Sequence, residues 1–121
     1  MASGLKRAAL ICGLATGLLS AGAAQAAPND GRWAVTVVTE KGNCEVYRWE
    51  FAVANGRVTP IGDAAARASG MIDPRGRVNV NFTRGSDTLS ATGNVSGANG
   101  SGRWTSPSRQ CNGRWSAEKT G

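Results

Sequence analysis

A two-residue alternation of apolar and polar side chains constrains this chain more than any other feature. The alternation is clearest in residues 32–37, 47–53 and 77–82. Side chains of a β-strand point alternately to the two faces of a sheet, so this period predicts strands with one buried face.

Clusters of turn residues separate these segments. Asn55-Gly56 and Asp73-Pro74-Arg75-Gly76 are typical of hairpins, because glycine and asparagine adopt the positive φ angles of tight turns. Similar clusters occupy residues 40–43, 84–87, 97–100 and 106–109, with a weaker break at 61–63. They divide the chain into about eight strands at intervals of about ten residues. This spacing predicts an all-β fold: a single small antiparallel up-and-down meander that forms a closed or nearly closed barrel, with a β-sandwich as the alternative.

The fourth strand is the least regular. We place it at about Arg67 to Ile72, where Gly70 indicates a bend or a close approach of two backbones.

The tripeptide Gly-Arg-Trp occurs three times, at residues 31–33, 102–104 and 113–115, and Gly-Arg-Val occurs at 56–58 and 76–78. We interpret the motif as the start of a strand: glycine ends the turn, arginine faces water and the large apolar residue takes the first inward position. On this interpretation most tryptophans belong to the core, and we expect Trp33, Trp49 and Trp104 to be buried.

The N-terminal segment has the pattern of a secretory signal peptide. Lys6 and Arg7 precede an uncharged run over residues 8–24, and Ala24-Gln25-Ala26 matches a signal-peptidase site. We therefore expect a cleaved signal at residues 1–26, a single barrel domain at residues 27–121, and a location in the periplasm or outside the cell.

Two cysteines remain after cleavage, because Cys12 leaves with the signal. In an exported chain a lone pair predicts one disulfide, here Cys44–Cys111. In a closed meander of eight strands, the second and eighth strands both lie beside the first. The two cysteines open those strands at the same end of the barrel.

Loss of Lys6 and Arg7 leaves 12 of the 14 basic residues against 8 acidic ones, a net charge of about +4. The ten arginines among them are scattered along the chain. They are compatible with a solvated outer surface or with attraction to an anionic envelope component.

The residue inventory argues against an enzyme. The chain has no histidine, so histidine-based triads and the usual zinc sites are excluded. No nucleophile elbow, phosphate-binding loop or dinucleotide fingerprint is present. We expect no catalytic residues, no metal and no cofactor.

The turn and strand motifs together resemble those of a group of small exported alphaproteobacterial proteins. The segments that carry this resemblance are Asp30-Gly31-Arg32-Trp33, Gly42-Asn43-Cys44, Asp73-Pro74-Arg75-Gly76-Arg77-Val78 and Cys111-Asn112-Gly113-Arg114-Trp115. The resemblance covers nearly the whole mature chain and implies an exported barrel-like protein rather than a specific activity. Some members carry automatic labels that mention haem utilisation or adhesion. Haem gains no support here, since Met71 and Tyr47 are the only usual axial ligands left.

Two classes of function remain open. The first is a binding module for a small apolar or glycan-like ligand, or for an anionic envelope component, held at a barrel mouth. Aromatic residues that could line this mouth are Trp33, Tyr47, Trp49, Phe82, Trp104 and Trp115. Our candidate site is Trp115 with Tyr47 and Arg114, at the cysteine-bridged end.

The second class is a protein-interaction or envelope-structural protein, including an inhibitor of a periplasmic or secreted enzyme. In either class we expect a monomer without specific nucleic-acid binding. We also expect no membrane span, because the outward positions include Arg32, Arg48 and Glu50.

Overall fold

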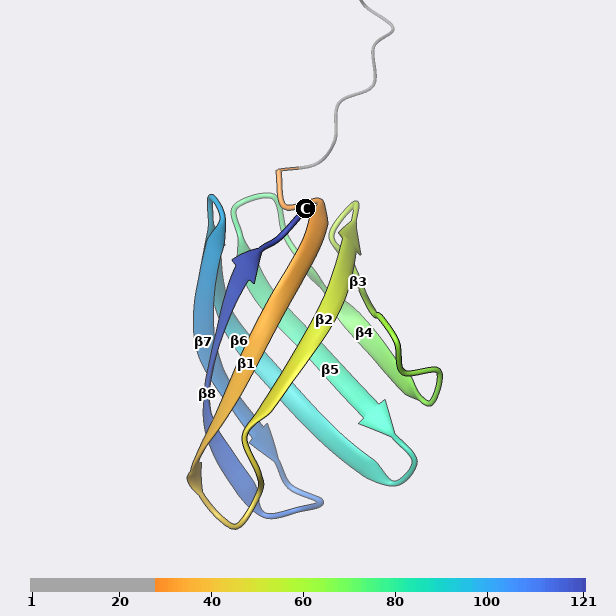
Figure 1. Cartoon of the computed structure of the whole chain (residues 1–121). Helices are drawn as coiled ribbons and strands as arrows, with labels where there is room; N and C mark the ends of the chain where they lie inside the picture. Colours follow the sequence, from red (N-terminus) through yellow and green to blue (C-terminus); the bar gives the residue numbers. More distant parts are fainter. Residues whose placement is uncertain (1–27) are drawn as a thin grey trace, which may run out of the picture.

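The computed structural model describes residues 28–121, so the predicted signal peptide lies outside the described residues. The described chain is all-β (Figure 1). Its eight strands are β1 (Gly31–Lys41), β2 (Tyr47–Ala54), β3 (Arg57–Pro60), β4 (Ala66–Ile72), β5 (Arg77–Arg84), β6 (Asp87–Ser96), β7 (Asn99–Ser106) and β8 (Cys111–Lys119). No helix in this part of the chain is long and apolar enough to cross a membrane.

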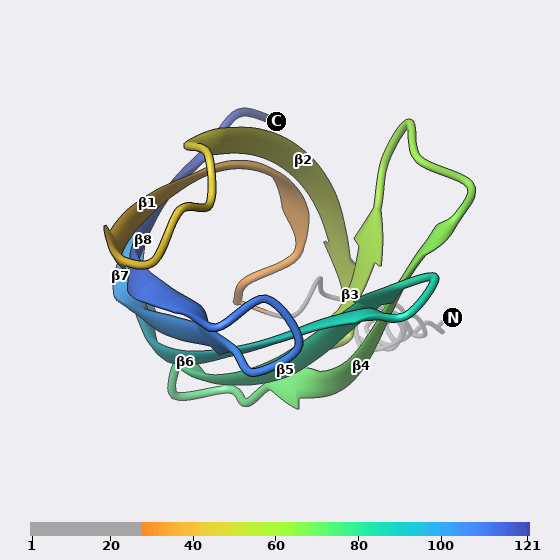
Figure 2. The same ribbon diagram turned by 90° about the horizontal axis from the view of Figure 1, so that it is seen from below.

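The strands form one antiparallel sheet in the order β3-β2-β1-β8-β7-β6-β5-β4. The predicted meander is confirmed, including the pairing of the first strand with the eighth, and the sheet curls into a nearly closed barrel rather than a sandwich (Figure 2). Edge strands β3 and β4 approach each other across a seam, where the Ile72 amide donates a hydrogen bond to the Gly56 carbonyl at 2.9 Å.

The barrel has two different ends. The closed end carries residues 28–30, the turns after β2, β4 and β6, and the C-terminus (Figure 1). The disulfide end carries the loops after β1, β3, β5 and β7. All strands run between these two ends, so the loops alternate between them along the chain.

Packing fills the closed end. Trp33 is 3% exposed, and its indole N–H donates to the Asn29 carbonyl at 3.0 Å. The Asn29 side chain is buried and donates in turn to the Asp73 carbonyl at 3.1 Å. The N-terminal residues therefore cover the core at this end. The core side chains in this half are Trp33, Val53, Ile72, Val78, Val80, Val95 and Ala117.

The predicted burial of Trp33 and Trp104 is confirmed, whereas Trp115, our candidate for the barrel mouth, is buried as well and Trp49 is not fully buried. Trp33, Trp104 and Trp115 are buried, with exposed fractions of 3%, 4% and 7%. Trp49 is only partly buried, so the expectation of a buried Trp49 was wrong. The reason is the short length of β3: it pairs with β2 only from Phe51 to Ala54 and leaves the strand beside Trp49 uncovered.

The interpretation of Gly-Arg-Trp as a strand start holds only for the copy at residues 31–33, which opens β1. The copies at 102–104 and 113–115 lie inside β7 and β8. They pair with each other, so that Gly102 is opposite Trp115 and Trp104 is opposite Gly113. Their glycines therefore make room within the barrel.

The predicted fourth strand is confirmed as β4, which extends from Ala66 to Ile72. Gly70 has a φ of +96°, and a Cβ there would collide with the Asn79 carbonyl oxygen. Gly70 thus marks a close approach of the β4 and β5 backbones, as its position indicated.

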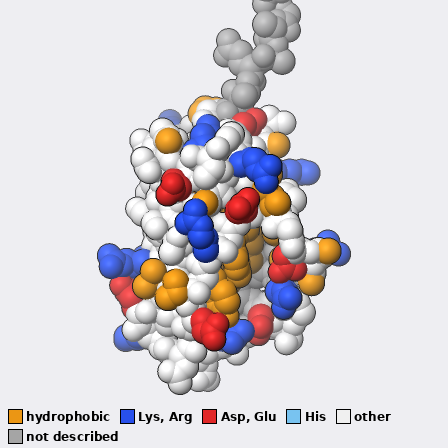
Figure 3. Space-filling model, in the orientation of Figure 1, with side chains coloured by type: hydrophobic (Ala, Val, Ile, Leu, Met, Phe, Trp, Pro, Cys, Tyr) orange, Lys and Arg blue, Asp and Glu red, His pale blue; other side chains and the backbone are white. Residues whose placement is uncertain are grey.

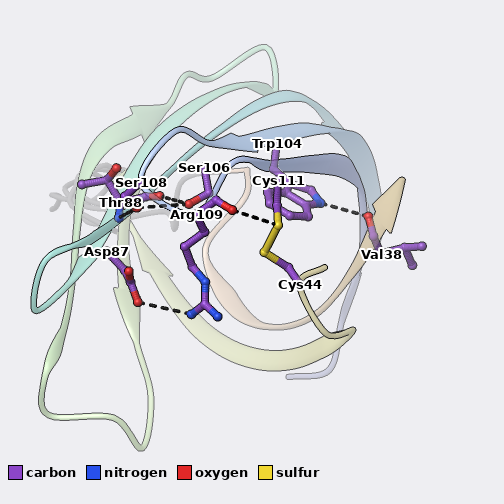
Figure 4. The surroundings of a disulfide bond; sticks show 9 residues. All are labelled: Val38, Cys44, Asp87, Thr88, Trp104, Ser106, Ser108, Arg109 and Cys111. Carbon is purple, nitrogen blue, oxygen red and sulfur yellow. Dashed lines mark hydrogen bonds and ion pairs between the residues drawn. A yellow bond between two sulfur atoms is a disulfide. The ribbon is translucent and has the colours of Figure 1, made fainter. Parts of the chain in front are cut away.

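The Cys44–Cys111 disulfide is present, with Cα atoms 6.2 Å apart (Figure 4). It ties the loop between β1 and β2 to the first residue of β8. The bond lies at the disulfide end, as the meander predicted.

Candidate ligand-binding cavity

The interior of the barrel is filled in one half and hollow in the other. Among the core side chains only a small pocket of about 70 Å³ remains, and its lining shares Trp49, Phe51 and Phe82 with the larger cavity. Toward the disulfide end the interior opens into a cavity of about 660 Å³. The inward side chains that line this cavity include Val37, Tyr47, Trp49, Phe51, Phe82, Leu89 and Trp104.

An aromatic cluster forms one wall of this cavity. Trp49 lies at its centre, with ring centroids 5.9 Å from Phe51 and 6.0 Å from Phe82, both in edge-to-face arrangements. Tyr47 is 5.8 Å from Trp49, and Phe51 is 5.0 Å from Phe82. The cluster joins β2 to β5 across the interior, on either side of the seam.

The cavity also opens sideways, through the barrel wall. The Ile61 amide donates to the Glu50 carbonyl at 3.0 Å, and beyond this bond β3 no longer accompanies β2. Hydrophobic side chains are visible in the resulting hollow between the lower half of β2 and β4 (Figure 3). We call this gap the lateral opening; Arg48 and Glu50 border it on β2, and Ile61 and Asp63 border it on the facing loop.

Ion pairs surround the cavity. Asp63 binds Arg84 at 2.9 Å, Asp87 binds Arg109 at 3.3 Å, and Glu50 lies 3.6 Å from Arg32. The hydrogen bond from Arg84, followed by that from the Ala65 amide, lowers the pKa of Asp63. Each carboxylate that lines the cavity is therefore matched by a guanidinium.

The structure separates the three predicted site residues. Tyr47 and Trp115 both flank Val37 in the sheet, but only Tyr47 lines the cavity. The Trp115 indole N–H donates to the Thr92 carbonyl at 3.0 Å. Arg114 points to the outer surface and binds Glu40 at 2.9 Å. Arg114 and Trp115 therefore lie on opposite faces of the sheet, as neighbouring residues of a strand do, and Trp115 is held in the core away from the cavity that Tyr47 lines.

The remaining sequence candidates divide in a similar way. Trp49 and Phe82 line the cavity as members of the wider aromatic set, whereas Trp33 lies in the packed half. Met71 is 54% exposed and does not line the cavity, so it does not converge with Tyr47 on a haem site. Sequence reasoning missed Arg48, because its location at an opening depends on where β3 ends.

Fold and site together define a small meander barrel that is plugged at one end and hollow at the other. Comparisons with protein-family models, with curated proteins and with solved structures find no match. The functional proposal therefore rests on the geometry of the cavity.

Proposed function

We propose that this chain is an exported, non-enzymatic barrel that binds a small ligand with an apolar body in the cavity at the disulfide end. The observation that carries the proposal is a cavity of about 660 Å³ with an aromatic wall. This volume lies in the range of about 300 to 1,000 Å³ that is usual for small-molecule sites. The disulfide supports export, because such bonds persist in oxidising compartments.

The chemistry of the wall favours an apolar ligand over a glycan. A glycan needs many hydrogen-bond partners beside an aromatic face, whereas Trp49, Phe51, Phe82 and Leu89 offer mainly apolar contact. The charged groups at the rim are largely occupied by one another. Apolar burial is thus the main source of affinity available here.

A titration with the neutral fluorescent probe N-phenyl-1-naphthylamine tests this proposal on the mature oxidised protein. We expect saturable binding, and we expect Trp49→Ala to weaken it about tenfold, since loss of one aromatic contact costs roughly 1.4 kcal/mol. Thr105→Ala, an exposed position on β7, is the matched control and should bind like the wild type. Absence of saturable binding by the folded wild type would refute the proposal.

A protein-interaction role, including enzyme inhibition, is a second candidate that one observation favours. Residues 47–49 of β2 have no strand beside them at the lateral opening, and an uncovered edge can accept an added strand. A docked polypeptide would protect the Arg48 amide, which faces this edge, from hydrogen exchange, whereas the amides of Tyr47 and Trp49 face β1. A small ligand in the cavity would leave the exchange of this edge unchanged.

A further inference from the structure

We propose that the ligand is an amphiphile with a single carboxylate headgroup, which Arg48 binds at the lateral opening while the apolar body occupies the cavity. This inference rests on the proposed function and adds the identity of the headgroup. It follows from the distribution of ion pairs around the cavity and from the position of Arg48 beside Trp49.

The cavity lining contains equal numbers of positive and negative side chains, but they do not all form ion pairs with one another. They are the carboxylates of Glu50, Asp63 and Asp87 and the guanidinium groups of Arg48, Arg84 and Arg109. Arg84 and Arg109 are taken up by Asp63 and Asp87, and Glu50 is matched by Arg32 from β1. Among residues 28–121, no carboxylate lies within ion-pair distance of Arg48. One cation at the site is therefore free for an anion.

Arg48 is also placed where a headgroup would emerge. It follows Tyr47 and precedes Trp49, whose rings enter the cavity, while its own side chain is exposed at the lateral opening. A ligand with its body against Trp49 can keep its headgroup in contact with water. The carboxylate would then gain the guanidinium contact without the cost of full burial.

Guanidinium geometry selects the class of headgroup. Its planar fork donates two parallel hydrogen bonds to one carboxylate. A single free guanidinium matches one negative charge, which favours a monocarboxylate over a polyanion.

Other arginines on the surface around the seam add to the positive electrostatic potential near Arg48. Arg57 on β3 and Arg67 on β4 are exposed, and neither makes an ion pair with a residue in the described range. With Arg48 they give the strands around the seam an excess of positive charge. Such a field attracts anions to the opening and weakens as salt concentration rises.

Competition between two ligands of equal chain length tests the inference. The affinities of decanoate and decan-1-ol are to be measured by their displacement of N-phenyl-1-naphthylamine from three proteins: the wild type, Arg48→Gln and Arg103→Gln. Arg103 is the matched control because it is exposed on β7 and does not line the cavity. At low salt we expect wild type and Arg103→Gln to prefer decanoate about tenfold, as a charge-assisted hydrogen bond provides. Arg48→Gln should lose this preference and keep its affinity for decan-1-ol.

The possible outcomes separate the two proposals. If wild type binds neither compound nor the probe, the proposed function itself fails. If it binds both compounds equally, or if Arg48→Gln retains the preference for decanoate, the headgroup assignment fails and the apolar site stands. An equal loss in Arg103→Gln would mean that net charge alone attracts the anion, and this would also overturn the assignment.

Discussion

At the scale of single residues, two copies of Gly-Arg-Trp form a self-complementary pair. Gly102 lies opposite Trp115, Trp104 lies opposite Gly113, and Arg103 lies opposite Arg114. On the outer face both arginines bind the carboxylate of Glu40, each at 2.9 Å. On the inner face a Cβ on Gly102 would lie 2.7 Å from the Trp115 indole nitrogen and would collide with the Thr92 carbonyl. Glycine is needed here for space.

Gly102→Ala should therefore destabilise the barrel. Overpacking of a filled interior typically costs about 1 to 3 kcal/mol, and we expect a loss in that range in urea unfolding. The neighbouring Ser101→Ala changes an exposed side chain on the same strand and should stay within about 0.5 kcal/mol of wild type. Equal stabilities of the two variants would contradict the packing role of Gly102.

Tryptophan accessibility gives a second test at this scale. Trp33, Trp104 and Trp115 are buried, and Trp49 is the partly exposed one. We expect acrylamide to quench one fraction of the emission and Trp49→Phe to remove that fraction, since phenylalanine retains the apolar contact without the indole. A quenchable fraction of unchanged size in this variant would show that another tryptophan is accessible.

At the scale of the elements, the disulfide joins two segments that flank β1. Cys44 lies in the loop before β2, whereas Cys111 begins β8, and both strands pair with β1. The same end of the barrel holds the cavity, where interior packing contributes least. The bond therefore restrains the half of the molecule that the core leaves weakest.

Removal of the disulfide should lower the free energy of unfolding substantially. The bond closes a loop with a sequence separation of 67 residues. For such a loop the chain-entropy estimate is on the order of 4 kcal/mol. Urea unfolding of the oxidised protein and of Cys44→Ser/Cys111→Ser measures the loss. A double variant with wild-type stability would contradict this role.

At the scale of the whole molecule, we expect two aspartates beside the seam, Asp73 and Asp63, to contribute to stability in acid. Asp73 accepts hydrogen bonds from the amides of Arg77 and Arg75, each at 2.9 Å, and these bonds lower its pKa. Asp63 joins the loop after β3 to β5 through Arg84, and its pKa is lowered as well. Both carboxyl groups therefore bind protons less readily in the folded barrel than in the unfolded chain.

The sign of the pH effect follows from this difference. A carboxyl group with a depressed folded pKa contributes stability that is present above its unfolded value of about 4 and is lost as pH falls through the folded value. We expect the urea concentration at the unfolding midpoint to decrease when the pH is lowered below about 4. For Asp73→Asn we expect a lower midpoint at neutral pH and a smaller decrease in acid. If the urea midpoints of wild type and variant decreased equally between about pH 7 and acid pH, Asp73 would not contribute to the pH dependence of stability.

The sequence by itself determined the features that depend on short stretches of chain. A period of two and turn residues such as Asn55-Gly56 specify strands and hairpins locally, so the number of strands and their meander order followed from them. The disulfide followed from the cysteine count and from the alternation of loops between two ends. Burial of Trp33 and Trp104 also agreed with the apolar pattern. Trp115, which the sequence analysis placed at a barrel mouth, is buried instead, and its grouping with Arg114 ignored the opposite faces of neighbouring residues.

Only the tertiary structure decided where the barrel is open and which groups face the opening. The exposure of Trp49 depends on β3 ending at Pro60, opposite Phe51. The guanidinium of Arg48 is free because Asp63 and Asp87 form ion pairs with Arg84 and Arg109. The pairing of Gly102 with Trp115 depends on the register between β7 and β8. Each of these contacts joins residues of different elements, and alternation along one strand contains no information about the length or register of its neighbour.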